Sequence, residues 1–377
     1  MPIRVTVAKE NTPGELRVAV VPAVAERLSG LGAEVLIEAG AGRRAHYPDA
    51  AYAKARIVAD TKELYEAAQV VLRVLPPTEE EIDRMAEGTV VIGFMMPYRH
   101  PERVARLRDR RITSFAMEFI PRIARAQSMD ALSSQASAAG YKAVLIGAGL
   151  TGRFFPMLTT AAGTIRPAKV LIIGAGVAGL QAIATARRLG AIVEAYDVRS
   201  VTKEQVESLG AKFVDVGVDA QSTGGYAREL TDEEKAHTAE ILGRHVAAAE
   251  VVITTAAVPG RTAPRILTTA MVEQMRPGAV IVDLAAESGG NCELTQPGES
   301  VDHGGVLIHG PLNVPSMLAA DASEMYARNI LNFLSLMIKD GELVPDWNDE
   351  VIAQSTLTRD GAIRHEATRN LVEGGDR

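Results

Sequence analysis

Short apolar runs alternate with longer amphipathic runs from the N-terminus to about residue 310, and this alternation is the most regular pattern along the chain. The short runs are rich in Val and Ile, which is typical of strands buried in parallel sheets. In the N-terminal region we expect helices such as 22–31 and 101–109, and strands near residues 3–8, 34–38, 69–74, 89–95 and 112–117. Further along the chain we expect strands near 170–173, 191–196, 212–216, 250–255, 279–284 and 305–309. The pattern predicts an α/β fold with parallel sheets.

Two long helical stretches divide this pattern into domains. Residues 128–146 are rich in Ala and Ser, and we expect them to form a helix that crosses from one domain to the other. Residues 323–339 are expected to carry the chain back. We therefore predict two Rossmann-like parallel-sheet domains joined by long helices, the first discontinuous (1–137, completed by 320–377) and the second at 138–319.

The C-terminal region carries one further signal. Asp360 and Gly361 stand between two alternating segments, and a two-residue Asp-Gly turn of this kind predicts a β-hairpin. We expect the last residues, about 367–377, to be disordered.

A glycine-rich turn with Gly174, Gly176 and Gly179 follows the first strand of the second domain, and the next strand ends in Asp197. Such a turn lets backbone N–H groups and the positive end of a helix face a pyrophosphate, while the acid accepts both ribose hydroxyls of an adenosine. The order of strand, turn, helix, strand and acid predicts a dinucleotide site; the alternative is a turn that only packs a helix on a sheet. A 2′-phosphate would meet the Asp197 carboxylate at close range, which favours NAD(H) over NADP(H). Arg199 nearby weakens that preference.

Charged and amide side chains crowd residues 121–135, where the chain is expected to leave the first domain. Arg122, Gln127 and Asp130 can hold a nicotinamide carboxamide and the adjoining phosphates through oriented hydrogen bonds, without a group that must titrate. The alternative is an ordinary helix start, with Ser128 or Asp130 as the cap and the arginines in solvent. Composition alone leaves both interpretations open.

Composition and charge narrow the class of protein. A chain of 377 residues is long enough for two domains with separate cores, and its net charge of −7 gives no reason to expect nucleic acid. Cys292 is the only cysteine, so no intrachain disulfide is possible and a reducing cytoplasm fits. The N-terminus lacks the apolar stretch of a signal peptide, and no window approaches about eighteen uninterrupted apolar residues, so we expect no membrane span.

Several stretches of the chain resemble those of a known family. They are Ala8-Lys-Glu, Glu15-Leu-Arg-Val-Ala, Arg125-Ala-Gln-Ser-Met-Asp-Ala-Leu-Ser-Ser-Gln, the glycine turn at Gly174, Asp283-Leu-Ala-Ala-Glu-Ser-Gly-Gly-Asn-Cys, Asn313-Val-Pro-Ser and Ala320-Asp-Ala-Ser. Over nearly its whole length the chain resembles the NAD(H)-binding component of proton-translocating NAD(P) transhydrogenases. In the split bacterial type of this family, that component is a separate polypeptide, the first alpha subunit. Ala-Gln-Ser-Met-Asp and Gly-Gly-Asn-Cys are the most specific of these strings.

The resemblance implies roles for individual residues. Arg122, Gln127 and Asp130 match the family's polar loop at the nicotinamide, where they would serve catalysis, and Ser133 lies beside it. The segment around Tyr226 resembles the family's mobile loop, which folds over the bound nucleotide, and its two glycines agree with that. The cofactor-binding residues expected in all are Gly174, Gly176, Val177, Ala178, Gly179, Asp197, Arg199, Arg122, Gln127, Asp130, Ser133, Tyr226, Thr255 and Ala256.

Alanine dehydrogenase is the related enzyme that must be distinguished, because it shares the two-domain plan and the neighbourhood of Arg17. It needs a carboxylate clamp and an acid/base that moves a proton with the hydride. Arg17 is present and Arg73 stands where that family has a lysine, but Met96 takes the place of the catalytic histidine. His100 would need a register shift to substitute for it. The other histidines show no paired metal spacing, and no metal site is expected: His46, His237, His245, His303, His309 and His365.

A missing acid/base agrees with hydride transfer between two nicotinamides, since that reaction releases no substrate proton at the reacting carbons. The resemblance implies a homodimer that binds NAD(H), an NADP(H)-binding beta subunit and a membrane-spanning second alpha subunit in which protons move. It also implies a cytoplasmic location at the inner membrane through these partners. Two alternatives remain, an alanine dehydrogenase-like amino-acid dehydrogenase and a regulatory NAD-binding module without turnover.

Overall fold

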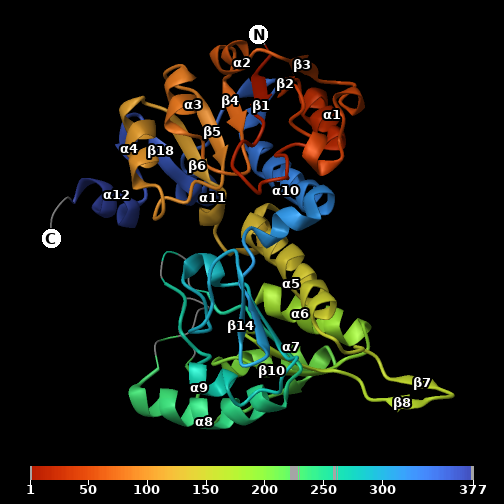
Figure 1. Ribbon diagram of the computed structural model, residues 1–377. Coiled ribbons are helices and arrows are strands. Elements are labelled where there is room, and N and C mark those ends of the chain that lie inside the picture. The colour runs from red at the N-terminus through yellow and green to blue at the C-terminus, as the bar shows by residue number, and fades with distance from the viewer. Residues whose placement is uncertain (1, 221–227, 229, 258–259, 261, 375–377) are drawn as a thin grey trace. The chain divides into compact units, whose positions relative to one another are not determined.

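The structure of the chain is a computed structural model that describes residues 2–220, 228, 230–257, 260 and 262–374 (Figure 1). It divides into two compact units, the first made of residues 1–135 and 316–377 and the second of residues 136–315. The division falls inside the long helix α5, Ala131–Leu150. The first unit is therefore discontinuous in sequence.

The first unit is built on an eight-stranded sheet in the order β19-β18-β6-β5-β4-β1-β2-β3. Six of the strands are parallel: β1 (Arg4–Val7), β2 (Glu34–Glu38), β3 (Arg56–Val58), β4 (Val70–Leu72), β5 (Val90–Gly93) and β6 (Thr113–Ala116). The hairpin of β18 (Thr356–Arg359) and β19 (Ala362–Ile363) adds an antiparallel edge beside β6. The parallel order 3-2-1-4-5-6 is that of a doubly wound fold.

Helices cover both faces of this sheet, because its strands are apolar on both sides. In β4, Val70 and Leu72 join one buried cluster, while Val71 between them joins another on the opposite face. Both α1 and α4 begin with a proline at the first turn, a position that needs no backbone N–H. The helices are α1 (Pro22–Gly30), α2 (Thr61–Glu66), α3 (Glu79–Arg84), α4 (Pro101–Asp109), α10 (Ala319–Leu334), α11 (Glu350–Ser355) and α12 (Glu366–Glu373).

The second unit repeats this architecture with a seven-stranded sheet in the order β11-β10-β9-β12-β13-β15-β14. Its parallel strands are β9 (Lys169–Ile173), β10 (Ile192–Tyr196), β11 (Lys212–Phe213), β12 (Val251–Thr254), β13 (Val280–Asp283) and β15 (Val306–His309). The antiparallel β14 (Ser300–His303) forms the edge. The helices are α6 (Val177–Arg188), α7 (Lys203–Ser208), α8 (Asp232–Ala248) and α9 (Thr269–Val272).

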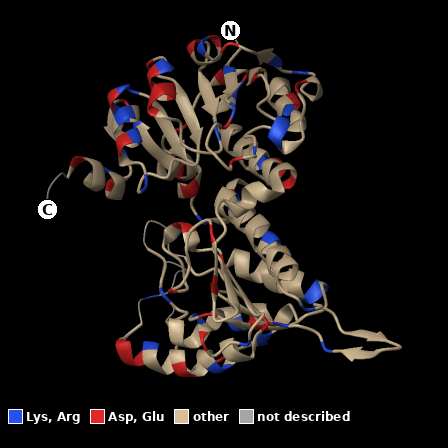
Figure 2. Ribbon diagram, in the orientation of Figure 1, with Lys and Arg blue, Asp and Glu red and all other residues tan. Residues whose placement is uncertain are grey.

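A projecting hairpin and a close helix contact distinguish the second unit. The hairpin is formed by β7 (Leu158–Thr160) and β8 (Gly163–Ile165) (Figure 1). The helices α5 and α6 pack closely at Gly140, where a Cβ atom would lie 2.0 Å from the Ala178 carbonyl oxygen. The first turn of α8 is acidic, as is that of α3 in the first unit (Figure 2), and these charges complement the helix dipole.

The observed elements confirm the predicted α/β class with parallel sheets, and the Asp360–Gly361 turn is the predicted hairpin. Three expectations need correction. The crossing helix runs over Ala131–Leu150, not 128–146, because Asp130 caps it. The returning helix ends at Leu334 and is followed by a small hairpin of β16 (Ile338–Lys339) and β17 (Glu342–Leu343). Residues 366–373 form the amphipathic helix α12 in place of the expected disorder.

Short and polar strands are the elements that the apolar pattern does not predict. They include β3, which has only three residues, the exposed β7–β8 hairpin and the polar edge strand β14. Among the described residues, no helix is long and apolar enough to cross a membrane.

Candidate functional site

The glycine turn after β9 has three glycines, which differ in the room that a Cβ atom would have. Gly174 has a φ of +95°, and a Cβ there would lie 2.6 Å from the Thr255 hydroxyl oxygen. A Cβ at Gly179 would lie 1.8 Å from the Gly174 carbonyl oxygen, so α6 can approach the turn only through a glycine. A Cβ at Gly176, by contrast, would meet no atom within 4 Å. Packing does not require that glycine, whereas a ligand lying against the backbone would.

The start of α6 is suited to an anion. Gly176 is the N-cap residue and has no side chain to bond the first N–H groups, and the first turn holds no acidic residue. Val177 at the first helical position is 43% exposed, so this end of the helix faces solvent. Backbone N–H groups and the positive end of the helix dipole are therefore available to a phosphate.

Asp197, directly after β10, lies against this turn and is 8% exposed. One carboxylate oxygen accepts the Ala175 N–H at 2.7 Å, which ties the turn to the second strand. The Arg199 guanidinium donates to both oxygens, from Nε at 2.9 Å and from Nη2 at 2.8 Å. The predicted acid lies beside the turn and is paired with Arg199, so ribose hydroxyls would compete with that guanidinium.

The segment after β12 closes the other side of the turn. Thr255 donates its backbone N–H to Ile173 at 2.8 Å and its hydroxyl to the Gly174 carbonyl at 3.0 Å. The backbone N–H and carbonyl of Ala256 both bond to the side chain of Asn291. Ala256 would therefore meet a nucleotide through its methyl group rather than through its backbone.

Asp283 and Asn291 stabilise this region, and the sequence interpretation gives them no role. Asp283 is fully buried at the end of β13 and accepts hydrogen bonds from the loop that contains Asn291. The available signal is an acid at the end of an otherwise apolar buried strand, since a buried carboxylate must have partners.

The polar segment belongs to the first unit and forms a short 3-10 helix, Ala124–Met129, before α5. Arg122 and Gln127 are exposed. Asp130 accepts the backbone N–H of Ser133 at 2.9 Å and its hydroxyl at 2.6 Å, so it caps α5. The helix-start interpretation is thus correct for Asp130, but Arg125 is not simply solvated, because it forms a bidentate pair with Asp349.

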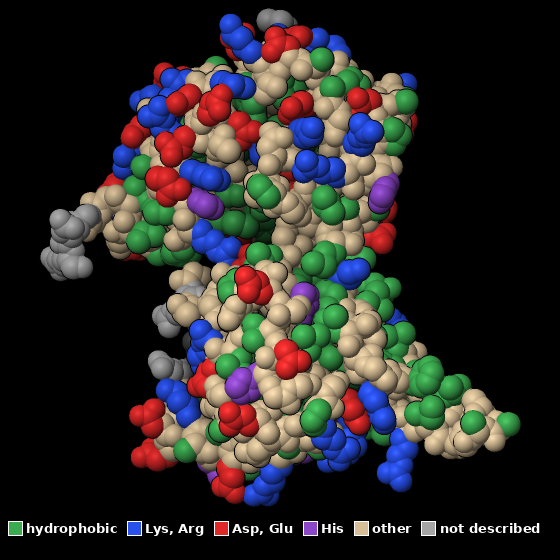
Figure 3. Space-filling model, in the orientation of Figure 1, with side chains coloured by type: hydrophobic (Ala, Val, Ile, Leu, Met, Phe, Trp, Pro, Cys, Tyr) green, Lys and Arg blue, Asp and Glu red, His purple; other side chains and the backbone are tan. Residues whose placement is uncertain are grey.

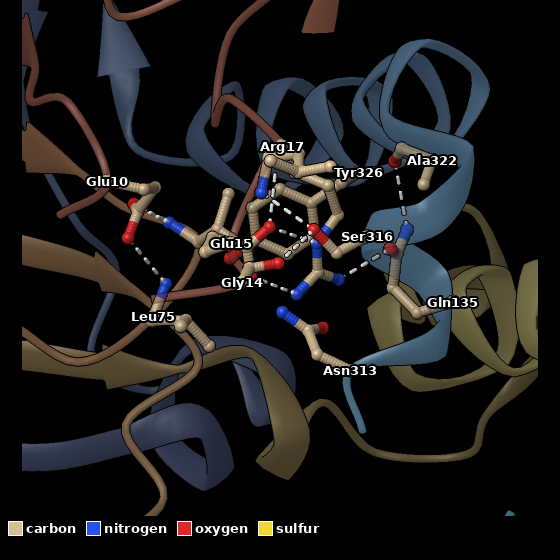
Figure 4. A network of polar contacts seen from close by, with 12 residues as sticks. Glu10, Gly14, Glu15, Arg17, Leu75, Gln135, Asn313, Ser316, Ala322 and Tyr326 are labelled. Carbon is tan, nitrogen blue, oxygen red and sulfur yellow. Dashed lines mark hydrogen bonds and ion pairs between the residues drawn. The ribbon is translucent and has the colours of Figure 1, made fainter. Parts of the chain in front are cut away.

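The two arginines near the N-terminal strands are buried and paired within the chain. Figure 4 shows Arg17 between Glu15 and Gln135. Its Nε and Nη2 contact the Glu15 carboxylate at 2.8 and 2.6 Å, and Nη1 contacts the Gln135 oxygen at 2.7 Å. Arg73 pairs with Glu10 through Nε at 3.2 Å and with Glu81 through Nη1 at 2.6 Å. Both arginines therefore have their charges paired by carboxylates of the first unit.

Met96 stands in a strained turn at the end of β5, with a φ of +45°. Its N–H donates to the Glu118 carboxylate at 2.6 Å, and that of Met95 does so at 3.0 Å. Burial raises the pKa of Glu118 to about 7. His100 is the N-cap residue of α4, and its Nδ1 lies 3.3 Å from Glu102.

The histidines and Tyr226 are the remaining residues that the sequence singled out. Within the described ranges, no group of three His, Cys, Asp or Glu side chains is arranged to hold a metal ion. Burial lowers the pKa of His309, whose Nδ1 lies 2.8 Å from the Ser300 hydroxyl. Tyr226 and the glycines beside it lie outside the described residues.

Comparisons with known proteins place this architecture in a family. Residues 6–139 match the alanine dehydrogenase/PNT N-terminal domain, and residues 143–366 match the alanine dehydrogenase/PNT C-terminal domain. The chain belongs to the alanine dehydrogenase/PNT family of oxidoreductases.

Within the family the chain is more similar in sequence to the transhydrogenases than to the alanine dehydrogenases that it matches. It is 48% identical to the first part of NAD(P) transhydrogenase subunit alpha of Rhodospirillum rubrum, over 97% of this chain and 98% of that one. The solved structure of a transhydrogenase from Sinorhizobium meliloti is 44% identical, with a TM-score of 0.86 over 97% of this chain and 99% of that one. An L-alanine dehydrogenase structure is 25% identical, with a TM-score of 0.82 over 99% of both chains. The resemblance inferred from sequence is confirmed.

Proposed function

We propose that the chain is the NAD(H)-binding subunit of a proton-translocating transhydrogenase, in which hydride passes directly between NAD(H) bound here and NADP(H) on a partner. The observation that carries the proposal is the open glycine turn at Gly176, beside Asp197, in a chain similar over 97% of its length to a transhydrogenase alpha subunit. A pyrophosphate that binds to backbone N–H groups requires a glycine at such a position, because a side chain would keep it from approaching the backbone.

The second unit binds the nucleotide in this proposal. The N–H groups at the start of α6 receive the pyrophosphate, with Val177, Ala178, Thr255 and Ala256 around it. Asp197 and Arg199 meet the adenosine ribose. Because Asp197 carries a negative charge where a 2′-phosphate would lie, NAD(H) is preferred, and the Arg199 pairing at 2.8 Å moderates that preference.

As the resemblance to transhydrogenases implies, the polar segment 122–133 orients the nicotinamide in this proposal. Arg122, Gln127, Asp130 and Ser133 supply donors and acceptors that need not titrate during the reaction. Arg122 and Gln127 are exposed, whereas the Asp130 carboxylate is engaged in capping α5, so these two residues are better suited than Asp130 to contact a ligand. Hydride leaves C4 of the dihydronicotinamide with its electron pair and forms the new bond at C4 of the oxidised nicotinamide, and no proton is released. The protein contributes orientation and exclusion of water.

Partner subunits complete the enzyme. The name of the Rhodospirillum rubrum relative denotes one portion of an alpha subunit, which implies further portions. We propose an NADP(H)-binding beta subunit and a membrane-spanning second alpha subunit, with this chain on the cytoplasmic side of the inner membrane. A homodimer is supported by exposed apolar side chains near the β7–β8 hairpin (Figure 3): Phe154 is 52% exposed, Met157 65% and Ile165 40%.

An alanine dehydrogenase-like activity is the second candidate, supported by the TM-score of 0.82 to that enzyme. Met96 cannot transfer the proton that amino-acid oxidation requires. The two are separated by assaying the purified chain. Alone, it should not oxidise NADH with pyruvate and ammonia. With an NADP(H)-binding subunit added, it should catalyse hydride exchange between NADH and an NAD analogue. Silence in both assays would indicate a regulatory module.

A further inference from the structure

We infer that Asn291, held in place by Asp283, is a positioning residue that sets the geometry of the glycine turn for pyrophosphate binding without contacting the nucleotide. The inference rests on the proposed NAD(H) site in the second unit. It adds a requirement to that site, namely a fully buried amide on a loop that follows a different strand.

Asp283 is the anchor of this arrangement. Its Oδ1 accepts the Thr254 hydroxyl at 2.8 Å and the Ala285 N–H at 3.0 Å. Its Oδ2 accepts the Asn291 N–H at 2.7 Å, the Cys292 N–H at 3.1 Å and the Thr295 hydroxyl at 2.6 Å. A buried carboxylate with this many donors has one stable orientation, because every alternative leaves charge or N–H groups unpaired. The loop that begins at β13 is thereby fixed to the end of β12.

Asn291 connects the loop fixed by Asp283 to Ala256, in the segment that follows β12. Its Oδ1 accepts the Ala256 N–H at 3.0 Å, and its Nδ2 donates to the carbonyls of Ala256 and Pro264, each at 2.8 Å. The side chain pairs with Ala256 as a neighbouring strand would. A flipped amide would set NH₂ against an N–H and oxygen against two carbonyls, so the geometry admits one orientation.

Thr255 completes the connection to the turn. It is the residue before Ala256, and its hydroxyl bonds the Gly174 carbonyl at 3.0 Å. Gly174 has so little room beside Thr255 that a Cβ would lie 2.6 Å from the hydroxyl oxygen. A shift of the 255–256 segment therefore moves Gly174, the first residue of the turn, or breaks the hydrogen bond to its carbonyl. Asn291 is 0% exposed, so its effect on a ligand passes through the 255–256 segment that it holds.

The test compares ligands with and without a pyrophosphate on the full chain. Binding of ADP-ribose is measured by titration calorimetry, and binding of adenosine by ligand-observed NMR. For Asn291→Ala, we expect the dissociation constant for ADP-ribose to rise about tenfold and that for adenosine less than about threefold, with the number of ADP-ribose sites unchanged. A merely structural loss would lower the number of sites or weaken both ligands equally.

Asn291→Asp keeps the volume but turns a second oxygen toward the carbonyls of Ala256 and Pro264. Its ADP-ribose affinity should improve relative to wild type as pH falls from 8 to 6, since a protonated carboxyl donates again, whereas that of Asn291→Ala should not. Thr185→Val is the matched control, because Thr185 is a buried threonine of α6 whose hydroxyl bonds Gln181 in its own helix. It should leave the ratio of the two constants unchanged.

If Asn291→Ala does not fold, Thr255→Val gives the same test, because it removes the hydroxyl that reaches Gly174 and keeps the shape. The ratio of the dissociation constant for ADP-ribose to that for adenosine should then rise by about threefold or more. An unchanged ratio in a folded variant, with wild type binding ADP-ribose, overturns the inference and leaves the proposed function intact. Wild type that binds neither NADH nor ADP-ribose overturns the proposed function itself.

Discussion

The carboxylate of Asp197 accepts the backbone N–H of Ala175 at 2.7 Å, so the acid at the end of β10 holds the glycine turn at the end of β9. The same carboxylate is paired with Arg199. The residue predicted to recognise the ribose therefore also shapes the turn proposed to bind the pyrophosphate, and we expect substitutions at this position to act on both.

Replacing Asp197 should weaken NADH binding and reduce discrimination against NADPH. We expect Asp197→Ala to cost about 1–3 kcal/mol of NADH affinity through lost charge-assisted hydrogen bonds, and to leave Arg199 available to a 2′-phosphate. Fluorescence titration of both nucleotides measures this. Arg199→Ala is the matched control and should widen the gap between NADH and NADPH. Unchanged NADH affinity in Asp197→Ala would show that the acid does not touch the ribose.

Gln127 should affect the rate more than binding. A hydride transfer without an acid/base depends mainly on how the two nicotinamides are oriented. Gln127→Asn should therefore slow the reaction in the reconstituted enzyme by at least about tenfold. NADH affinity should change less than about threefold. Gln354→Asn, an exposed amide on α11, serves as the control for both measurements. Equal losses in rate and affinity would make Gln127 a simple binding contact.

The ion pair of Arg17 and Glu15 should matter for stability. Both residues are buried, at 4% and 0% exposure, so Arg17→Met leaves a buried carboxylate without its counter-charge. We expect a loss of about 3–5 kcal/mol in the free energy of unfolding, measured by urea denaturation. Replacing both residues, as Glu15→Leu with Arg17→Met, should recover most of it. A double variant as unstable as the single one would refute the explanation.

Glu118 should make stability depend on pH near neutrality. Burial raises its pKa to about 7, above the value of 4.5 for an unperturbed group, so the folded chain binds the proton more tightly than the unfolded one. Its contribution is complete below about pH 4.5 and is lost as pH rises through about 7. Glu118→Gln should therefore flatten the dependence of the melting temperature on pH between 5 and 8. A curve parallel to that of wild type would contradict this assignment.

The elements that the sequence predicted well are those with a repeated physical cause. Strands buried on both faces, such as β9 and β12, must be continuous apolar runs, and glycines without room for a Cβ atom, such as Gly174 and Gly179, allow no other residue. The short strand β3 and the polar edge strand β14 lack such a signal.

The partners of polar side chains could not be predicted in the same way. That Arg199 pairs with Asp197, or that Asn291 pairs with Ala256, depends on which strand ends are neighbours and on angles that no spacing along the chain records. The sequence could show that Asp283 ends an apolar buried strand, but the loop that supplies its donors is visible only in three dimensions.

Direct hydride transfer between nucleotides on two subunits can be followed with an isotope. The chain and an NADP(H)-binding subunit are supplied with NADH deuterated at the transferred C4 position, together with oxidised NADP. We expect deuterium in the NADPH formed, without loss to solvent, and no turnover by either protein alone. We also expect no NADH oxidation by this chain with pyruvate and ammonia. Deuterium exchanged into water, or pyruvate-dependent turnover, would contradict the proposed function.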